Sequence, residues 1–284
     1  MEGAEGVACD ILDVALLDEV MQGVEKVYHC AAIVSFHKNA QDEMLRINVE
    51  GTANIVNACI DAGVKKMLYV SSVAALGEPE NAVPVNEKNV YAGKGTFYGK
   101  TKFNAEMEAW RGNAEGLQMV AVNPSIILGA SDWNAGSTQL FKNVYEEFPY
   151  YTEGIHGFVD VCDVAEAMVQ LMESDISGER FILNGANISF KELFTLMAHT
   201  FDKKPPAKKA TPLMSEIVWR LSYLSAKIKG KKSLLTKETA RSAQTKVLYD
   251  NSKILNALLG FTFTPMEQTI KRIAQELKQR YKLV

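Results

Sequence analysis

Short apolar runs alternate with helical segments along the first half of the chain, and this order constrains the fold. Strand-like runs are expected at residues 7–10, 24–29, 66–71 and 117–122. Segments with helical periodicity separate them, at about 16–22, 42–62 and 94–110. Such alternation is typical of a parallel sheet with helices on both faces. The sequence therefore predicts an α/β fold, in which Gly63 suits a left-handed cap at the end of the long second helix.

Two serines end the third apolar run, and a Tyr-x-x-x-Lys pair follows them. Ser71 and Ser72 precede Tyr98 and Lys102, which lie four residues apart and share one face of a helix. Carbonyl reduction builds negative charge on oxygen, so the site must supply a proton and a further hydrogen-bond donor. Tyr98 would give the proton and Ser72 would hold the oxygen. Lys102 would lower the phenol pKa so that phenolate forms near neutral pH.

The same spacing recurs at Tyr223 with Lys227 and at Tyr249 with Lys253. Neither pair follows a strand that ends in serine. We therefore interpret both pairs as surface or packing residues, and we assign catalysis to Ser72, Tyr98 and Lys102.

Five further blocks, together with this trio, resemble the extended short-chain dehydrogenase/reductases, also described as NAD-dependent epimerase/dehydratases. The blocks are ACDILD at 8–13, VYHCAA at 27–32, INVEGTANIVNAC at 47–59, VNPSIILG at 122–129 and FVDVCDVAEA at 158–167. The resemblance extends over nearly all of the chain and is strongest to the dihydroflavonol-reductase-like branch. It implies a Rossmann-like doubly wound parallel sheet, a smaller interwoven α/β substrate lobe, and NAD or NADP as the cofactor.

The resemblance also implies which residues contact the cofactor. Asp10 with Ile11 would meet the adenine, and the backbone after the second strand would run along the dinucleotide. The loop after the fourth strand would lie beside the nicotinamide. The implied contacts are Asp10, Ile11, Cys30, Ala31, Ala32, Ser71, Lys102, Pro124, Ser125 and Ile127.

The resemblance further implies how the chain divides and assembles. Residues 1–128, with about 157–186 and 247–258, would form the dinucleotide-binding lobe. The substrate lobe would comprise about 129–156, 187–246 and 259–284. The helices at 42–62 and 94–110 would form the interface of a homodimer.

One block of the family pattern is not found in the sequence. The family opens with a strand, a Gly-x-x-Gly-x-x-Gly turn and a helix that hold the pyrophosphate. Met1 falls roughly where the third strand of that fold is expected. The run at 24–34 would then present an unpaired sheet edge, which favours aggregation. We therefore expect an N-terminally incomplete sequence, the alternative being a shortened relative that has lost activity.

Composition excludes several other classes of protein. A net charge of −3 argues against a nucleic-acid partner. Four cysteines without paired spacing are typical of a reduced, cytoplasmic protein. No apolar run approaches the roughly 18 residues that a membrane span requires, and the four scattered histidines predict no metal site.

The second half of the chain bears on the substrate. Between Gly129 and Ser189 only Lys142 and Arg180 are basic, whereas a nucleotide-sugar enzyme needs arginine or lysine to clamp a diphosphate. The sequence thus favours a small, apolar carbonyl substrate. A nucleotide-sugar epimerase or dehydratase and a non-catalytic dinucleotide-binding protein remain the alternatives. Six aromatic residues within 141–158 would line an apolar pocket or belong to the core.

Two later segments have helical patterns. Residues 212–232 place apolar side chains near helical spacing, with lysines before and after them. Such a helix either packs on its lobe, which is the commoner case, or lies on a membrane surface. An amphipathic helix is also predicted at 266–281.

Overall fold

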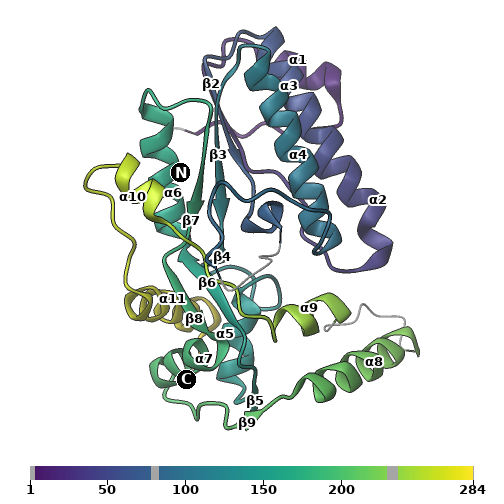
Figure 1. Cartoon of the computed structure of the whole chain (residues 1–284), viewed down its shortest axis with the longest axis vertical. Helices are drawn as coiled ribbons and strands as arrows, with labels where there is room; N and C mark the ends of the chain where they lie inside the picture. Colours follow the sequence, from purple (N-terminus) through teal and green to yellow (C-terminus); the bar gives the residue numbers. More distant parts are fainter. Residues whose placement is uncertain (1–3, 78–82, 229–235, 284) are drawn as a thin grey trace. The chain divides into compact units, whose positions relative to one another are not determined.

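The computed structural model describes residues 4–77, 83–228 and 236–283, with the backbone alone for 221–228 (Figure 1). The chain divides into two compact units, each formed by several segments. The first unit comprises Met1–Gly77, Glu87–Asn123 and Met168–Phe181, and the second Glu78–Asn86, Pro124–Ala167 and Ile182–Val284. The division into dinucleotide-binding and substrate lobes is a statement about function and stays a prediction.

The first unit is built on a sheet with the strand order β1-β2-β3-β7. Its strands are β1 (Lys26–His29), β2 (Lys66–Val70), β3 (Gln118–Pro124) and β7 (Glu179–Leu183). β2 pairs in parallel with both β1 and β3, so the predicted α/β fold with a parallel sheet is confirmed. All residues of β3 except the first are buried, as expected for a strand with both faces covered.

Helices cover this sheet. α1 (Val14–Val20), α3 (Gly51–Asp61) and α4 (Phe97–Ala114) lie together on one side, and α3 and α4 run next to each other (Figure 1). The last turn of α6 (Val161–Glu173) is fixed to β2, because the buried Lys66 ammonium donates to the carbonyls of Leu171 and Ser174 at 2.6 Å each. The core of the first unit includes Leu17, Val56, Met67, Tyr69, Ala105 and Met119.

The strand predicted at residues 7–10 is not present. Residues 4–10 have no regular structure, and no strand of the described chain pairs with them. The Asp13 amide donates to the Asp10 carbonyl at 2.9 Å, and the Leu12 amide donates to the Asp10 carboxylate at 3.0 Å. Backbone groups that have no neighbouring strand take local partners instead, which here form a turn.

The long helix predicted at 42–62 is interrupted. The helical path runs through the short helix η1 (Lys38–Ala40), α2 (Gln41–Met44), the π-helical stretch η2 (Leu45–Glu50) and α3. The wider turn has a polar cause, because the Asn48 side chain bonds the backbone of Ile33 and the Asn48 carbonyl accepts from the Thr52 hydroxyl at 2.6 Å. The predicted cap is confirmed, since Gly63 has φ +69°.

The second unit contains the sheet β4-β6-β8, formed by β4 (Ile126–Leu128), β6 (Ile155–Asp160) and β8 (Ala186–Ser189). β6 pairs in parallel with β4 and antiparallel with β8. Three helices pack on this sheet and on each other: α5 (Thr138–Tyr145), α7 (Phe190–Thr200) and α11 (Met266–Tyr281). The prediction of a helix at 266–281 is therefore confirmed.

The remaining elements are short, with one exception. They are η3 (Val73–Leu76), β5 (Tyr150–Tyr151), β9 (Lys208–Lys209), α9 (Lys237–Ser242) and α10 (Ser252–Ala257). The exception is α8 (Pro212–Ile228), which follows the predicted 212–232 helix as far as the described residues reach. A helix able to span a bilayer is not found among the residues that the structure describes.

Two of the aromatic residues at 141–158 belong to the core, as one of the two interpretations expected. Phe141 and Phe158 are fully buried in the core of the second unit, where they pack with Phe190 and Phe201. Phe148 is 53% exposed. The core explanation therefore holds for the first two residues.

Candidate active site

The end of β2 presents the two serines. The Ser71 amide donates to the Val122 carbonyl at 2.7 Å, which extends the pairing with β3 by one residue. Ser72 then leaves the strand and caps η3, because its hydroxyl accepts from the Ala74 amide at 3.2 Å. Two consecutive serines thus have different surroundings, and only Ser72 is partly exposed while Ser71 is buried.

Tyr98 lies in the first turn of α4. Thr96 caps this helix by accepting from the Gly99 amide at 3.0 Å. The N-terminus of α4 lies against η3, and a Cβ at Gly99 would be only 2.7 Å from the Ala74 carbonyl oxygen. This close approach brings the Tyr98 phenol within hydrogen-bond reach of the Ser72 side chain. Burial raises the pKa of Tyr98, and the hydrogen bond with Ser72 partly opposes that rise.

Lys102 lies one turn further along α4 and is 2% exposed. Its ammonium donates to the Val70 carbonyl at 2.8 Å and lies 4.5 Å from the centre of the Tyr69 ring. Burial lowers the pKa of Lys102 to about 8, against the upward influence of Glu106. The charge of Lys102 adds to burial in lowering the pKa of His29, the last residue of β1, to about 4.

The predicted influence of Lys102 on the pKa of Tyr98 is not found in the structure. Lys102 was expected to lower the pKa of Tyr98, but burial raises that pKa. The reason is that the ammonium points to the carbonyl of Val70 at the end of β2. In this arrangement two influences act on the Tyr98 pKa: burial, which raises it, and the hydrogen bond with Ser72, which lowers it.

A buried carboxylate, which the sequence did not lead us to predict, organises the residues behind the trio. Glu106 accepts from the Ser71 hydroxyl at 2.5 Å, from Asn123 at 2.8 Å and from Arg180 at 3.0 Å. Asn123 also donates to the Ser72 carbonyl at 3.1 Å. A sequence signal did exist, because Glu106 continues the four-residue spacing of Tyr98 and Lys102. The partners Asn123 and Arg180 come from distant parts of the chain and have no such signal.

Asn48 is a second polar residue that the prediction missed. Its side chain accepts from the Ile33 amide at 2.7 Å and donates to the Ile33 carbonyl at 2.9 Å. It also donates to the Thr101 hydroxyl at 3.1 Å. Asn48 therefore fixes the segment after β1 to the helix that carries Tyr98 and Lys102.

The residues expected at the cofactor divide between the two units. In the first unit Asp10 and residues 30–32 are exposed, as a binding surface requires. Ile11 packs so tightly on Gly51 that a Cβ there would be 2.4 Å from its Cδ1. In the second unit the Ser125 hydroxyl is buried and lacks a hydrogen-bond partner among the described residues. Pro124 and Ile127 lie in β3 and β4 on either side of it.

Of the other two Tyr-x-x-x-Lys pairs, the structure describes the side chains only of Tyr249 and Lys253. The backbone of Tyr249 bonds the side chain of Asn187, with 3.0 Å from its amide and 2.9 Å to its carbonyl. The side chains of Tyr223 and Lys227 lie outside the described residues.

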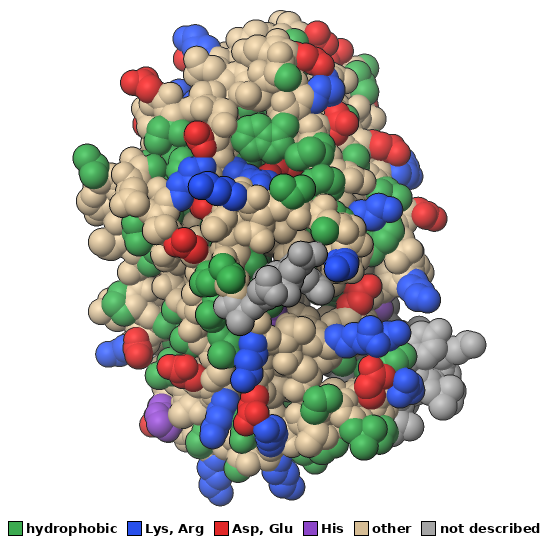
Figure 2. All heavy atoms as spheres, in the orientation of Figure 1, with side chains coloured by type: hydrophobic (Ala, Val, Ile, Leu, Met, Phe, Trp, Pro, Cys, Tyr) green, Lys and Arg blue, Asp and Glu red, His purple; other side chains and the backbone are tan. Residues whose placement is uncertain are grey.

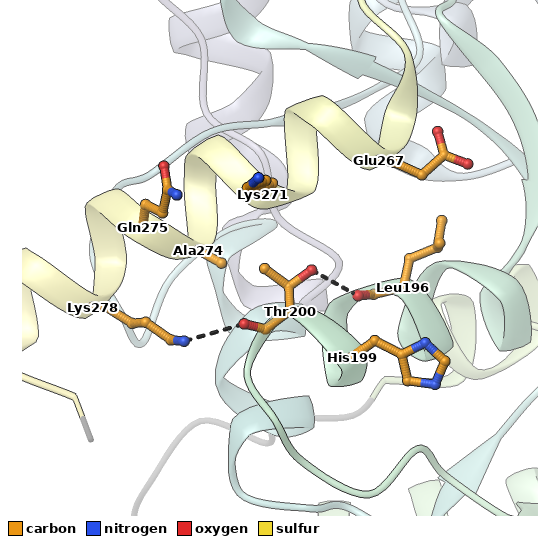
Figure 3. Close-up of a pocket in the computed structure, with 8 residues that line it drawn as sticks. All are labelled: Leu196, His199, Thr200, Glu267, Lys271, Ala274, Gln275 and Lys278. Atoms are coloured by element: carbon orange, nitrogen blue, oxygen red, sulfur yellow. Dashed lines mark hydrogen bonds between the residues drawn. The ribbon is translucent and has the colours of Figure 1, made fainter.

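An open pocket of about 410 Å³ lies between α7 and α11 in the second unit (Figure 3). Figure 3 shows that Lys278 turns toward the end of α7, where its ammonium donates to the Thr200 carbonyl at 3.1 Å. None of the predicted site residues lines this pocket. The lining residues are Leu196, His199, Thr200, Glu267, Lys271, Ala274, Gln275 and Lys278.

Comparison with known proteins gives a consistent family. The model of the NAD dependent epimerase/dehydratase family matches residues 2–184. The putative dihydroflavonol 4-reductase of Synechocystis sp. is 27% identical over 252 residues, which cover 85% of this chain and 73% of that protein. Sterol demethylase protein B of Methylococcus capsulatus is 28% identical over 188 residues, 65% of this chain and 57% of that protein. The crystal structure of gox2253 is similar with a TM-score of 0.81 and 29% identity, over 97% of this chain and 85% of that one.

Proposed function

The chain belongs to the NAD-dependent epimerase/dehydratase family, and we propose that it is an oxidoreductase that interconverts a carbonyl and a secondary alcohol on a small, apolar substrate. The observation that carries the proposal is the meeting of Ser72 and Tyr98 at the end of β2, with the buried ammonium of Lys102 one helical turn away. The name of the putative dihydroflavonol 4-reductase relative supports a reductase.

Each residue of the trio has a chemical role in this proposal. Tyr98 gives a proton to the substrate oxygen during reduction and takes it back during oxidation. Ser72, already within hydrogen-bond reach of the phenol, holds the same oxygen where negative charge develops. A bound nicotinamide supplies or accepts the hydride. Lys102, whose pKa of about 8 keeps it largely cationic at neutral pH, favours the phenolate form once its ammonium is near the phenol.

Several groups of this chain fit a dinucleotide. The exposed residue Asp10 and the backbone of the exposed residues 30–32 would meet the adenine half. The Ser125 hydroxyl and the side-chain amide oxygen (Oδ1) of Asn123 are buried polar atoms without a protein partner among the described residues. A buried polar group without a partner is costly, so these atoms suit positions that a ligand completes. We propose NAD or NADP as that ligand.

The two basic residues between 129 and 189 support an apolar substrate. Lys142 donates to the Asn134 side chain at 2.6 Å and lies 3.9 Å from Glu146. Arg180 is bound to Glu106 at 3.0 Å and to the carbonyl of Glu87. Both cations are therefore engaged, whereas a nucleotide diphosphate requires cations that face the substrate.

Replacing Tyr98 by Phe tests the proposal. With NADH or NADPH and a panel of small aromatic and alicyclic ketones, kcat should fall at least about 100-fold, because the proton donor is lost. Binding of the reduced cofactor, followed by its fluorescence, should persist. Tyr249→Phe, which alters a Tyr-x-x-x-Lys pair of the same spacing, is the matched control and should retain activity.

Two outcomes would redirect the assignment. Unchanged turnover in Tyr98→Phe would remove the trio from the reaction. Turnover of a uridine diphosphate sugar, without turnover of the ketones, would select the epimerase or dehydratase alternative.

We also propose that the protein is cytoplasmic. We further propose that the helices at 42–62 and 94–110 form the interface of a homodimer, and light scattering would test whether the protein is dimeric in solution.

A further inference from the structure

The Arg180 side chain joins three parts of the first unit. It extends from β7, and its guanidinium donates to the Glu106 carboxylate on α4 at 3.0 Å. The same guanidinium donates to the Glu87 carbonyl at 2.9 and 2.6 Å and to the Asn89 carbonyl at 2.7 Å. A planar guanidinium serves three acceptors at once because its donors form a fixed fork, whereas the lysine ammonium is a compact point charge. Arg180 therefore fixes the chain at 87–89 to both β7 and α4.

The ion pair of Arg180 with Glu106 differs from the ion pairs at the surface. Figure 2 shows Lys, Arg, Asp and Glu side chains spread over the visible face of the molecule. Partly exposed pairs, such as Arg111 with Glu108, contribute little to stability. The Glu106 side chain is 1% exposed and that of Arg180 18%, so this pair has lost most of its hydration. A buried pair is weak evidence for stability, since apolar residues in its place are often at least as stabilising.

The segment 87–96, which the guanidinium holds at its beginning, leads directly into the helix of Tyr98. It contains turns and bends but no helix or strand, so its backbone groups depend on local and side-chain partners. In the middle of the segment Tyr91 stacks on Phe103 of α4, with the ring centres 5.1 Å apart. The segment ends at Thr96, the residue that caps α4. Its placement therefore affects where the first turn of α4, with Tyr98, lies.

Glu106 links the guanidinium to the other residues of the trio. Its carboxylate accepts from Asn123, which also donates to the Ser72 carbonyl at 3.1 Å. The charge of Glu106 raises the pKa of Lys102, against the stronger effect of burial. Through one carboxylate, Arg180 thus acts on the serine that follows β2 and on the buried ammonium of α4.

We propose that Arg180 is a positioning residue for the reaction: it holds the segment 87–96 and Glu106 where they bring Tyr98 and Ser72 together. The inference rests on the proposed function, because positioning has a meaning only if the trio reacts. Arg180 acts through Glu106 and the segment rather than on the substrate itself. A misplacement of about 1 Å can cost about 100-fold in rate, so loss of the guanidinium fork should be visible in kcat.

Hydrogen exchange of the segment 87–96 tests the first half of the inference without any substrate. Arg180→Met removes the bonds of the guanidinium, and Arg180→Lys keeps a positive charge without the fork. In both variants the amides of 87–96 should exchange at least about tenfold faster than in the unaltered protein. Arg111→Met is the matched control, because Arg111 bonds Glu108 and Glu115 on α4, and it should exchange as the unaltered protein does.

Steady-state kinetics with the ketone panel test the second half. Both variants of Arg180 should lower kcat at least about tenfold, because Tyr98 and Ser72 are no longer held at the same point. The KM for NADH or NADPH should stay unchanged. Arg111→Met should retain the kcat of the unaltered protein.

The pH profile of kcat separates the two variants. Arg180→Met removes a cation beside Glu106, so the carboxylate acts more strongly on Lys102, and the alkaline limb should move to higher pH by about half a unit. Arg180→Lys keeps the cation and should leave the limb in place. A residue that only adds stability would not move this limb.

The other titratable groups around Lys102 are neutral at pH 7–8 and do not produce such a shift. Burial lowers the pKa of His29 to about 4. Burial raises the pKa of the remaining three groups, which are Cys30, Tyr69 and Tyr98.

The two measurements together decide the inference. Unchanged exchange of 87–96 in both variants would overturn it, and so would faster exchange with an unchanged kcat, because the ion pair would then be structural only. If Arg180→Met does not fold, Arg180→Lys decides by the same two measurements. Full turnover in the Arg180 variants, with turnover lost in Tyr98→Phe, refutes the positioning role alone. Unchanged turnover in Tyr98→Phe refutes the proposed function itself.

Discussion

Replacing Lys102 by Met should remove a specific pH dependence of stability. The Lys102 ammonium is 2% exposed, and burial lowers its pKa to about 8 from the ordinary value of 10.5. Between these two pH values the unfolded chain binds a proton that the folded chain lacks. Stability therefore rises with pH through this window. Methionine has a similar length and no charge, so the variant should lack this rise.

The size of the effect follows from the two pKa values. One pKa unit corresponds to about 1.4 kcal/mol, so the buried ammonium destabilises the folded state by about 3 kcal/mol at pH 7. About 2 kcal/mol of this destabilisation disappears between pH 7 and pH 9.5. The lost hydrogen bond to the Val70 carbonyl lowers the stability of the variant equally at both pH values. The informative quantity is thus the difference between the two pH values.

Urea unfolding at pH 7 and pH 9.5 measures this difference. The unaltered protein should gain about 2 kcal/mol relative to Lys102→Met between the two conditions. Groups that titrate equally in both proteins cancel in the comparison. Lys100→Met is the control, because Lys100 is exposed on the same helix, and it should follow the unaltered protein. Parallel pH profiles for the unaltered protein and Lys102→Met would refute the assignment of a buried ammonium at this position.

Two other substitutions test the surroundings of the trio. Glu106→Gln should lower the pKa of Lys102 further, because Glu106 raises it, and should shift the alkaline limb of the kcat pH profile to lower pH. The same change leaves the Arg180 guanidinium without its carboxylate partner and should lower the free energy of unfolding by about 3 kcal/mol, measured in urea. Gly99→Ala would place a methyl group 2.7 Å from the Ala74 carbonyl oxygen, so α4 must shift. We expect Gly99→Ala to lower the free energy of unfolding by about 1–3 kcal/mol and to lower kcat. If both quantities stay unchanged, the contact between α4 and the Ala74 carbonyl is not rigid.

The sequence was sufficient where the determinants are local. The last helix occupies the predicted residues 266–281, because its apolar period and its flanking residues lie within the segment itself. Gly63 has the predicted left-handed conformation, which depends on its own backbone. The two serines, Tyr98 and Lys102 were placed correctly at the end of β2 and in the start of α4, because a strand and a helix with four-residue spacing are both visible in the sequence.

The sequence was not sufficient where distant groups decide. A strand at residues 7–10 requires a neighbouring strand, and its apolar pattern carries no information about whether one is present. The π-helical stretch depends on the bonds of Asn48 to Ile33, and these bonds join segments that the pattern treats separately. The direction of the Tyr98 pKa shift likewise depends on where the Lys102 ammonium points, which the four-residue spacing leaves open.

The buried charges around the trio favour a functional origin. Lys102 and Glu106 are both almost fully buried on one helix, although apolar residues at these positions would avoid the desolvation of two charges. Glu106 is bound on several sides, yet the pKa of Lys102 is still lowered to about 8, so the pair does not recover the full desolvation energy of the ammonium. Buried titratable groups of this kind are concentrated at sites where chemistry requires them. A chain selected for stability alone would have no reason to keep a buried ammonium one helical turn from the Tyr98 phenol.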